Sequence, residues 1–351
     1  MSGLRRVLVI DDSAYNRRTI IKMIESVPGV TVAGYAGDGE EGLRKAIDLE
    51  PDLITLDLEM PRLDGFAFLR ILMQKRPTPV IVVSSRSDDE NVFKALEFGA
   101  VEFVAKPSAR ITPDLYNIQD DLVRKIAGIA GIDRRKLRQR LDTGSGPAPG
   151  GLRQPSQREG KFATHVVIAS STGGPPALQQ IFSALQQPVP IGFAIAQHMP
   201  PGFTKAFAER LNKFCALTIR EARSGDVMEP GCVLIAPGGK NLILRERSGE
   251  IVAYVVDPDS GQRYTPAADA LFLSAGEVFG PRALGVVLTG MGNDGARGVV
   301  RIKNKGGQTL AEAESSSVVY GMPKEAVATG MVDKIVPLPM MCREILRRCG
   351  Y

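Results

Sequence analysis

Short runs of aliphatic and β-branched residues alternate with amphipathic stretches along the first part of the sequence. Between the runs, apolar positions recur at helical spacing, as in RRTIIKMIESV (17–27) and EEGLRKAIDLE (40–50). Five such units predict a parallel sheet with right-handed crossovers and helices on both faces, in an α/β domain over residues 1–130. The predicted strands are 6–10, 30–36, 52–56, 79–84 and 101–105.

The last part of the chain repeats this alternation. Helical stretches include PPALQQIFSAL (175–185) and TKAFAERLNKF (204–214). We therefore expect a second α/β domain over residues 163–351, so that the fold class is two doubly wound parallel-sheet domains. Its predicted strands are 164–170, 191–196, 232–236, 251–256, 283–289 and 307–311.

A segment of different composition separates the two patterns. Residues 142–160, DTGSGPAPGGLRQPSQREG, are rich in Gly, Pro, Ser and Gln and contain almost no apolar side chains. Such a segment cannot bury enough apolar surface to offset the entropy lost on ordering. We expect a flexible, basic linker over residues 131–162.

The composition is that of an ordinary globular protein, with 44% hydrophobic and 24% charged residues in a chain of 351. No apolar run reaches the roughly 18 residues that span a bilayer, so we expect no direct membrane insertion. The start, MSGLRRVLVIDD, runs straight into a strand pattern, which predicts a cytoplasmic protein without a signal peptide. The widely spaced cysteines favour free thiols; they are Cys215, Cys232, Cys342 and Cys349.

A net charge of +5 is a reason to consider a nucleic-acid partner. Residues 131–160, however, hold seven Lys and Arg residues against three acids and so carry +4 of that total. The remainder is nearly balanced and offers no broad basic field for a polyanion. We interpret the basic segment as a solvated hinge and expect no nucleic-acid partner.

Polar residues follow the predicted strands of the first domain. Asp11 and Asp12 come after the first strand, Asp57 after the third, Ser84 at the end of the fourth and Lys106 after the fifth. In open α/β sheets the ligand site lies beyond the carboxyl ends of the strands. Crowded carboxylates repel one another, so they predict a divalent cation, and oxygen ligands favour Mg²⁺. The lysine and the hydroxyl opposite them could hold a phosphoryl group.

The motifs VLVIDDS, DLITLDLEMPRLDGFAFL and FVAKPS resemble the receiver domain of bacterial response regulators, with its flavodoxin-like fold. The resemblance implies that Asp57 accepts a phosphoryl group from a chemotaxis sensor histidine kinase. Ser84 and Lys106 would bind the phosphoryl oxygens, and Phe103 stands at the position of a switch aromatic. The implied Mg²⁺ ligands are Asp11, Asp12, Asp57 and the backbone of Glu59.

The strand-end rule picks out three further residues in the second domain. Ser171, His198 and Asp294 follow three predicted strands, and they are the parts of a nucleophile, its base and the group that orients the base. The pattern alone does not choose between Ser170 and Ser171 as the nucleophile. The other histidine, His165, lies within or just before a predicted buried strand, and we interpret it as structural.

Two phosphate-binding alternatives use the same strand ends. Gly173 and Gly174 open a helix, where backbone N–H groups could bind phosphate, but no GxxxxGK[ST] sequence follows. GMGNDG, residues 290–295, matches GxGxxG, with Glu312 near the place of a ribose-binding acid. Asp294 inside this loop would repel a pyrophosphate, and the motif lies near the end of its domain, so we disfavour dinucleotide binding.

The motifs ASSTGGPPAL, AQHMPPGFTKAFAERLN, LIAPGGKNL, LTGMGNDGARG and SSSVVYGMPKEAV resemble the chemotaxis receptor methylesterases, the CheB family. The resemblance implies that Ser171 is the nucleophile, His198 the general base and acid, and Asp294 the orienting acid. Thr172 and Met291 would flank the site, with the backbone N–H of Met291 as an oxyanion donor.

The resemblance also implies a function. It predicts a phosphorylation-activated enzyme that hydrolyses glutamate γ-methyl esters on chemoreceptors, deamidates receptor glutamines and so mediates chemotactic adaptation. The esterase domain would need no cofactor, and we expect a monomer. Alternatives are the same chemistry in a non-flagellar chemosensory array, or a phosphorylation-dependent interaction protein without activity.

The sequence departs from the common family pattern at a few positions. Ala169 and Ser170 stand where Gly and Ala are usual, and both are small enough for the turn. In YTPAADALF (264–272), Ala267 replaces an expected serine, which affects the expected substrate contacts and leaves the proposed triad unchanged.

Overall fold

The chain forms two compact α/β units, residues 1–144 and 145–351, in a computed structural model. The structure describes residues 5–85, 89–106, 118–129 and 162–351. Apart from Phe162, the predicted linker 131–162 lies outside the described residues. No helix in the described ranges is long and apolar enough to cross a membrane. All four cysteines are free thiols, as predicted.

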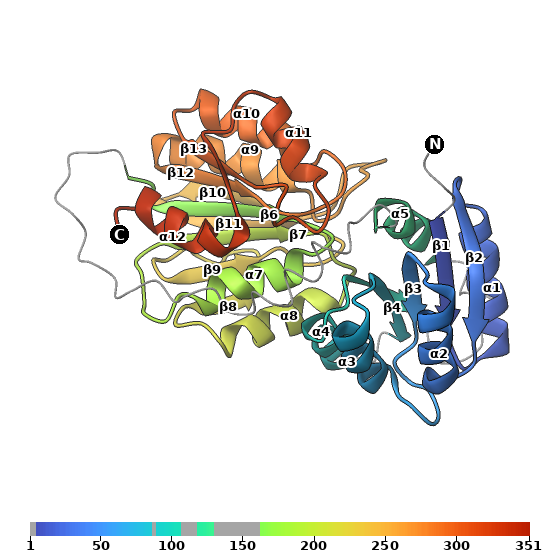
Figure 1. Ribbon diagram of the computed structural model, residues 1–351. Coiled ribbons are helices and arrows are strands. Elements are labelled where there is room, and N and C mark those ends of the chain that lie inside the picture. Colours follow the sequence, from blue (N-terminus) through green and yellow to red (C-terminus); the bar gives the residue numbers. More distant parts are fainter. Residues whose placement is uncertain (1–4, 86–88, 107–117, 130–161) are drawn as a thin grey trace. The chain divides into compact units, whose positions relative to one another are not determined.

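The first unit is a five-stranded sheet with the order β2-β1-β3-β4-β5, and every neighbouring pair is parallel (Figure 1). The strands are β1 (Arg5–Ile10), β2 (Val30–Ala36), β3 (Leu53–Leu56), β4 (Val80–Ser85) and β5 (Glu102–Lys106). The helices are α1 (Ala14–Glu25), α2 (Gly39–Leu49), α3 (Gly65–Lys75), α4 (Asp89–Glu97) and α5 (Gln119–Ile129). Helix α1 packs beside α5, and α2 packs beside α3.

Strand pairing sets the position of the acidic residues in the first unit. Ile10, the last residue of β1, pairs with Leu56, the last residue of β3, so the residues that follow these two strands leave the sheet side by side. Ser84 of β4 pairs with Ala105 of β5. The buried, continuously apolar runs of these central strands are typical of a parallel sheet covered on both faces.

The second unit contains a seven-stranded, all-parallel sheet with the order β14-β13-β12-β6-β7-β9-β8. Its strands are β6 (His165–Ser170), β7 (Gly192–Gln197), β8 (Thr218–Glu221), β9 (Cys232–Ile235), β12 (Ala283–Val287), β13 (Gln308–Glu312) and β14 (Lys334–Val336). The prediction of two α/β domains built on parallel sheets is therefore confirmed.

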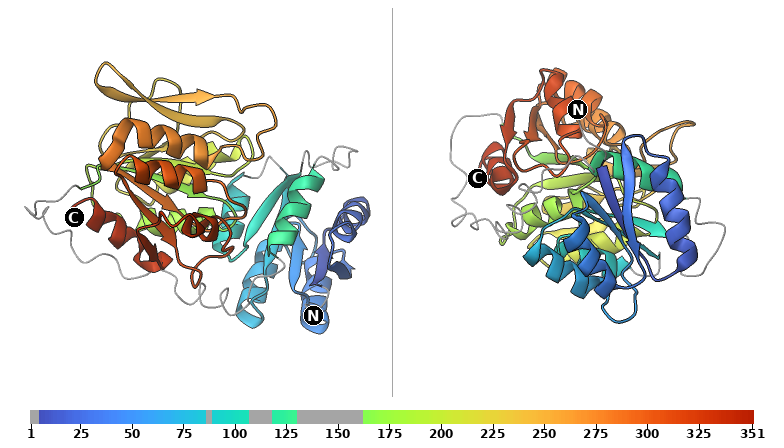
Figure 2. Two further views of the ribbon diagram at one scale, coloured as in Figure 1. Left: turned by 90° about the horizontal axis from the view of Figure 1, so that it is seen from above. Right: turned by 45° about the vertical axis from the view of Figure 1, so that its right-hand side comes forward.

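Helices cover both faces of this sheet (Figure 2). One layer contains α7 (Gly174–Ser183), α8 (Phe203–Asn212) and α12 (Leu338–Arg348), and α7 packs beside each of the other two. The core on the other face joins the sheet to α9 (Ala268–Phe279), α10 (Ala296–Asn304) and α11 (Met322–Ala328). Val167 and Ala169 of β6 point into this second core, together with Phe272 of α9.

The predicted strand 251–256 exists but does not belong to the parallel sheet. It is β11 (Glu250–Val256), which pairs antiparallel with β10 (Asn241–Arg247) in a separate hairpin. The turn between them is Ser248-Gly249, and both residues have positive φ, 54° and 84°, as tight hairpin turns require. Leu242, Leu244 and Ala253 of this hairpin pack into the core around α9.

The pairing around β6 brings the predicted catalytic strand ends together. Ser170 of β6 pairs with Gln197 of β7, and Ala169 pairs with Val287 of β12. The three strands β12, β6 and β7 are therefore neighbours and end at one edge of the sheet. The chain segments that follow them carry Ser171, His198 and the loop after β12.

The buried environment of His165 gives a test of the packing in the second unit. Its ring stacks on Phe279, with centroids 4.0 Å apart, and burial together with the charge of Arg282 lowers the pKa of His165 to about 4. Between pH 4 and 6.5 the unfolded chain therefore binds the proton more readily, so stability is lost as pH falls through this window. We expect His165→Phe to lose about 2–3 kcal/mol less unfolding free energy than the wild type between pH 7 and 4.5. Urea unfolding at both pH values measures this, and equal losses in the two proteins would contradict the assignment.

Candidate functional site

Ser171 begins the turn between β6 and α7. Its backbone N–H donates to the carbonyl oxygen of Thr289, with N···O 3.0 Å, and its own carbonyl oxygen accepts from the N–H of Gly174 at 2.7 Å. The side chain is half-buried, whereas that of the neighbouring Ser170 is fully buried. Of the two serines that the pattern left open, Ser171 is therefore the one that solvent or a substrate can reach.

Ser170 holds the turn together through Gln197. The Ser170 hydroxyl donates to Oε1 of Gln197 at 2.6 Å. The Nε2 atom of this buried glutamine donates to the carbonyl oxygens of Ser171 and His198, at 3.1 and 3.0 Å. One amide side chain thus fixes the backbone of both proposed catalytic residues.

His198 and Asp294 form a direct contact. The Nε2 atom of His198 lies 2.7 Å from Oδ2 of Asp294, and the two side chains are only 12% and 5% exposed. An ionised carboxylate accepts hydrogen bonds and donates none, so Nε2 is the donor. The proton on Nε2 leaves Nδ1 as the free basic nitrogen of the neutral imidazole.

Asp294 also holds the start of α9. Its Oδ2 accepts the backbone N–H of Ala268 at 2.7 Å, and its Oδ1 accepts that of Asp269 at 2.9 Å. Burial raises the pKa of Asp294. The hydrogen bond from His198, the charge that this histidine carries when protonated, and these two N–H groups outweigh burial and lower the pKa below its ordinary value. The carboxylate therefore stays ionised at neutral pH and fixes the tautomer of His198.

Ser171 and His198 follow paired residues of two neighbouring strands, and the described residues show no hydrogen bond between the Ser171 hydroxyl and His198. The backbone N–H of His198 donates to the carbonyl oxygen of Ser170 at 3.0 Å, which ties the two turns together. From the β12 side, Gly290 approaches so closely that a Cβ there would lie 2.8 Å from Cβ of Ser171. Bonds between a nucleophile and its base are often long before substrate binds.

Thr172 and Met291 flank the serine. Thr172 is buried, and its carbonyl oxygen accepts from the Thr289 hydroxyl at 2.9 Å. Met291 is half-buried in the loop after β12, and no acceptor within the described residues pairs with its backbone N–H. This N–H group is available to an oxyanion.

Sequence reasoning missed Tyr264. Its ring stacks on the imidazole of His198, with centroids 5.0 Å apart and an angle of 6° between the planes. A single tyrosine in a loop carries no periodic signal, and only the folded chain brings it to a histidine 66 positions earlier in the sequence.

Glu312 has a structural role. It is fully buried at the end of β13, where Oε2 accepts the backbone N–H of Thr289 at 2.8 Å and Oε1 accepts the Ser316 hydroxyl at 2.9 Å. These bonds support the strand end beside Ser171.

The first unit gathers its acids as the strand-end rule predicts. One carboxylate oxygen from each of Asp11, Asp12 and Asp57 lies within 4.8 Å of the others. Asp11 and Asp57 are buried, and Asp12 is exposed. The backbone N–H of Glu59 contacts Oδ1 of Asp57 at 3.4 Å, so residue 59 lies next to the cluster. Three carboxylates with an adjacent backbone fit the oxygen ligands that Mg²⁺ prefers.

Lys106 and Ser84 complete this edge. Nζ of Lys106 donates to Asp11 at 2.9 Å and also forms an ion pair with Asp57. Burial, followed by the charge of Asp11, raises the pKa of Asp57 to about 6 against the opposing effect of Lys106. The Ser84 hydroxyl is buried and has no hydrogen-bond partner within the described residues. A buried hydroxyl without a partner at this edge of the sheet fits a site that receives a further group.

Comparison with protein-family models gives matches for both units. The model for the CheB methylesterase matches residues 166–345, and the model for the response regulator receiver domain matches residues 7–112. The chain belongs to the CheB methylesterase family. The family predicted from the sequence motifs is confirmed.

Similar proteins cover almost the whole chain. A protein-glutamate methylesterase/protein-glutamine glutaminase of Geobacter sulfurreducens is 56% identical over 98% of this chain and 97% of its own length. One of Myxococcus xanthus is 46% identical over 96% of this chain and 94% of its own length. The crystal structure of the Thermotoga maritima CheB methylesterase catalytic domain is 37% identical, covers 53% of this chain and 98% of its own, and has a TM-score of 0.51.

The structure gives a physical reading of one departure from the common CheB pattern. Ala267, which stands where a serine is usual, is the N-cap residue of α9 and supplies no side-chain hydrogen bond. The two N–H groups that Asp294 accepts belong to the next two residues. In this CheB domain the buried carboxylate therefore does the capping.

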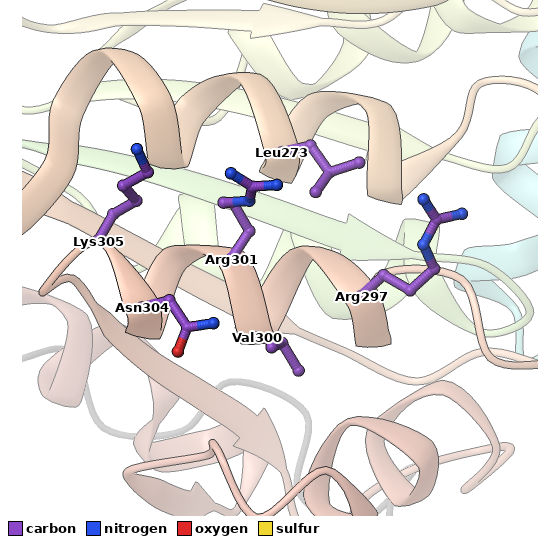
Figure 3. A pocket seen from close by; sticks show the side chains of 6 residues that line it. All are labelled: Leu273, Arg297, Val300, Arg301, Asn304 and Lys305. Carbon is purple, nitrogen blue, oxygen red and sulfur yellow. The ribbon is translucent and has the colours of Figure 1, made fainter.

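A separate cavity of about 440 Å³ lies between α9 and α10 (Figure 3). Two of its cations, Arg301 and Lys305, pair with Glu277 at 2.6 and 2.7 Å. The lining residues are Leu273, Arg297, Val300, Arg301, Asn304 and Lys305. No predicted site residue is among them.

Asp294→Asn tests the carboxylate. An amide has one acceptor oxygen, so it cannot accept from both Ala268 and Asp269 while also accepting from His198. We expect kcat for ester hydrolysis to fall about 10³–10⁴-fold because the imidazole tautomer is no longer fixed. Steady-state methanol release measures this. The matched control is Asp269→Asn, whose carboxylate binds the N–H of Gly298 instead; an equal loss in both variants would contradict the role given to Asp294.

Proposed function

We propose that this chain is a phosphorylation-activated protein-glutamate methylesterase that hydrolyses glutamate γ-methyl esters on chemoreceptors and deamidates receptor glutamines. The observation that carries the proposal is the buried contact between His198 and Asp294, at the sheet edge where Ser171 emerges. Membership of the CheB methylesterase family and the names of the similar proteins support it. We propose a cytoplasmic monomer that acts in chemotactic adaptation.

The first half of the reaction acylates Ser171. Its Oγ forms a bond to the ester carbonyl carbon while its proton passes to Nδ1 of His198. The imidazolium keeps its Nε2 proton in the bond to Asp294, and this stabilises the new positive charge. The oxyanion of the tetrahedral intermediate accepts from the backbone N–H of Met291, and one such donor typically contributes about 3 kcal/mol.

The second half restores the enzyme. The bond to the methoxy oxygen breaks, and the proton on Nδ1 of His198 leaves with it as methanol. Water then donates a proton to Nδ1 and attacks the acyl carbon; Oγ of Ser171 leaves and regains the proton. A glutamine amide follows the same steps and releases ammonia in place of methanol, and both substrates yield a free glutamate.

Regulation rests on the first unit. We propose that Asp57 accepts a phosphoryl group from a chemotaxis sensor histidine kinase. Asp11, Asp12, Asp57 and the backbone of Glu59 would hold Mg²⁺, which would neutralise part of the phosphoryl charge. Lys106, which now pairs with the Asp57 carboxylate, would pair with the phosphoryl oxygens. The hydroxyl of Ser84, which has no partner within the described residues, would donate a hydrogen bond to the same oxygens.

The adjacent serines give a matched test of the nucleophile. We expect Ser171→Ala to reduce methanol release from methylated receptor membranes about 10⁴–10⁶-fold, because no other hydroxyl replaces it. Ser170→Ala removes a bond to Gln197 but no reacting atom, so we expect activity within about tenfold of wild type and a loss of about 1 kcal/mol in stability. Equal release by Ser171→Ala and wild type would leave only a phosphorylation-dependent binding role.

Asp57→Asn tests the phosphoryl acceptor. We expect the ratio of methanol release with and without a small phosphodonor to fall to about 1, since an amide cannot form the acyl phosphate. Asp48→Asn removes the same charge from an exposed position on α2 and is the control that keeps the stimulation. Persistent stimulation of Asp57→Asn would place the acceptor elsewhere.

A further inference from the structure

The loop before α9 carries Tyr264, whose ring stacks on the imidazole of the proposed base, His198. Tyr264 stacks on His198 with nearly parallel planes, at a centroid distance of 5.0 Å. Its hydroxyl reaches the loop that carries Met291, because a Cβ placed on Gly292 would lie 2.1 Å from the Tyr264 oxygen. Gly292 has φ +91°, so both its backbone and its missing side chain suit this approach. One side chain therefore contacts the base and the loop of the oxyanion donor.

A pair of amides, buried Asn241 and half-buried Gln262, holds this loop in place. Asn241 donates from Nδ2 to Oε1 of Gln262 at 2.8 Å, and Gln262 donates from Nε2 back to Oδ1 of Asn241 at 3.0 Å. Gln262 Nε2 also donates to the carbonyl oxygen of Tyr264 at 2.5 Å, and Oδ1 of Asn241 accepts the N–H of Ala267 at 2.9 Å. Asn241 is 4% exposed. The tyrosine is thus presented by a fixed backbone between the hairpin and α9.

We propose that Tyr264 is a positioning residue of the esterase, which holds the imidazole of His198 flat against its ring and favours the imidazolium that forms when Ser171 gives up its proton. This inference rests on the proposed function. The face of an aromatic ring carries partial negative charge and attracts a cation stacked on it. The contact is therefore stronger in the transition state than in the resting enzyme, which is the condition for raising kcat.

Other charged groups near the imidazole set the sign of the expected pH effects. Asp294 accepts the Nε2 proton, and the charges of Asp294 and Arg297 both act on the carboxylate of Asp269, the next acid in this region. On the ring side, the exposed guanidinium of Arg263 lies 5.3 Å from the centroid of Tyr264. This cation competes with the imidazolium for the same ring, so loss of Tyr264 and loss of Arg263 should move the acid limb of the pH profile in opposite directions.

The experiment compares kcat, KM and the pH profile of methanol release for four variants of the full chain. Tyr264→Phe keeps the ring, and we expect kcat within about threefold of wild type. Tyr264→Leu keeps bulk but no ring; we expect kcat about tenfold lower, KM little changed and the acid limb at lower pH. Arg263→Gln should move the limb to higher pH, by an amount that shrinks as salt is added. Arg301→Gln, an exposed arginine paired with Glu277, should change none of these.

The results distinguish a failure of the inference about Tyr264 from a failure of the proposed function. Wild-type kcat and pH profile in Tyr264→Leu overturn the inference, and so does an equal loss in Tyr264→Phe, which would assign the effect to the hydroxyl. If Tyr264→Leu does not fold, as thermal unfolding would show, Arg263→Gln decides: an unmoved limb overturns the inference and a limb at higher pH supports it. Ser171→Ala is measured alongside; if it retains methanol release, the proposed function fails rather than the role of Tyr264.

Discussion

One buried carboxylate constrains the whole of the proposed esterase site. Asp294 accepts three hydrogen bonds, two from the first turn of α9 and one from His198. Bonds to a charged acceptor are typically worth about 2 kcal/mol each, and together they allow an ion to remain charged in the interior. The same contacts fix the distance between α9 and the β7 strand end. The orientation of the base is therefore part of the packing of the domain.

Both units use the same geometric rule for different chemistry. Parallel strands end at one edge, so residues far apart in the sequence meet there without any local motif. In the first unit this edge concentrates acids around Asp57, and Lys106 offsets only part of their repulsion. In the second it places Ser171 and His198 on adjacent strands. In the proposed function, the first unit supplies a phosphoryl acceptor and the second a hydrolase.

Most of the fold could be predicted from the sequence because buried parallel strands are continuous apolar runs. The predicted strand 30–36 matches β2 at both ends, and other predicted strands differ from the observed ones by one or two residues. Edge strands β8 and β14 have four and three residues and give no usable pattern. In the hairpin, β11 was predicted as a strand and β10 was not. The sequence of 251–256 does not show which strand it pairs with, so its place outside the parallel sheet was missed.

Candidate site residues could be predicted where they directly follow a strand of the sheet. They could not be predicted where a loop from elsewhere in the chain folds back onto the site. Asp57, Ser171, His198 and Asp294 belong to the first kind. Tyr264 belongs to the second, since its place depends on the bonds of Asn241 and Gln262. The strand pattern alone left Ser170 and Ser171 open as nucleophile. The family resemblance selected Ser171, and the full burial of Ser170 in the structure agrees with that choice.

The most direct test of the account is the protonation of His198, measured by nitrogen NMR on protein labelled at histidine. The chain has only two histidines, so the spectrum contains two imidazoles. We predict that, where the enzyme is active, His198 carries its proton on Nε2 and that Nδ1 is free. A proton on Nδ1 would leave no lone pair for the hydroxyl of Ser171 and would contradict the mechanism.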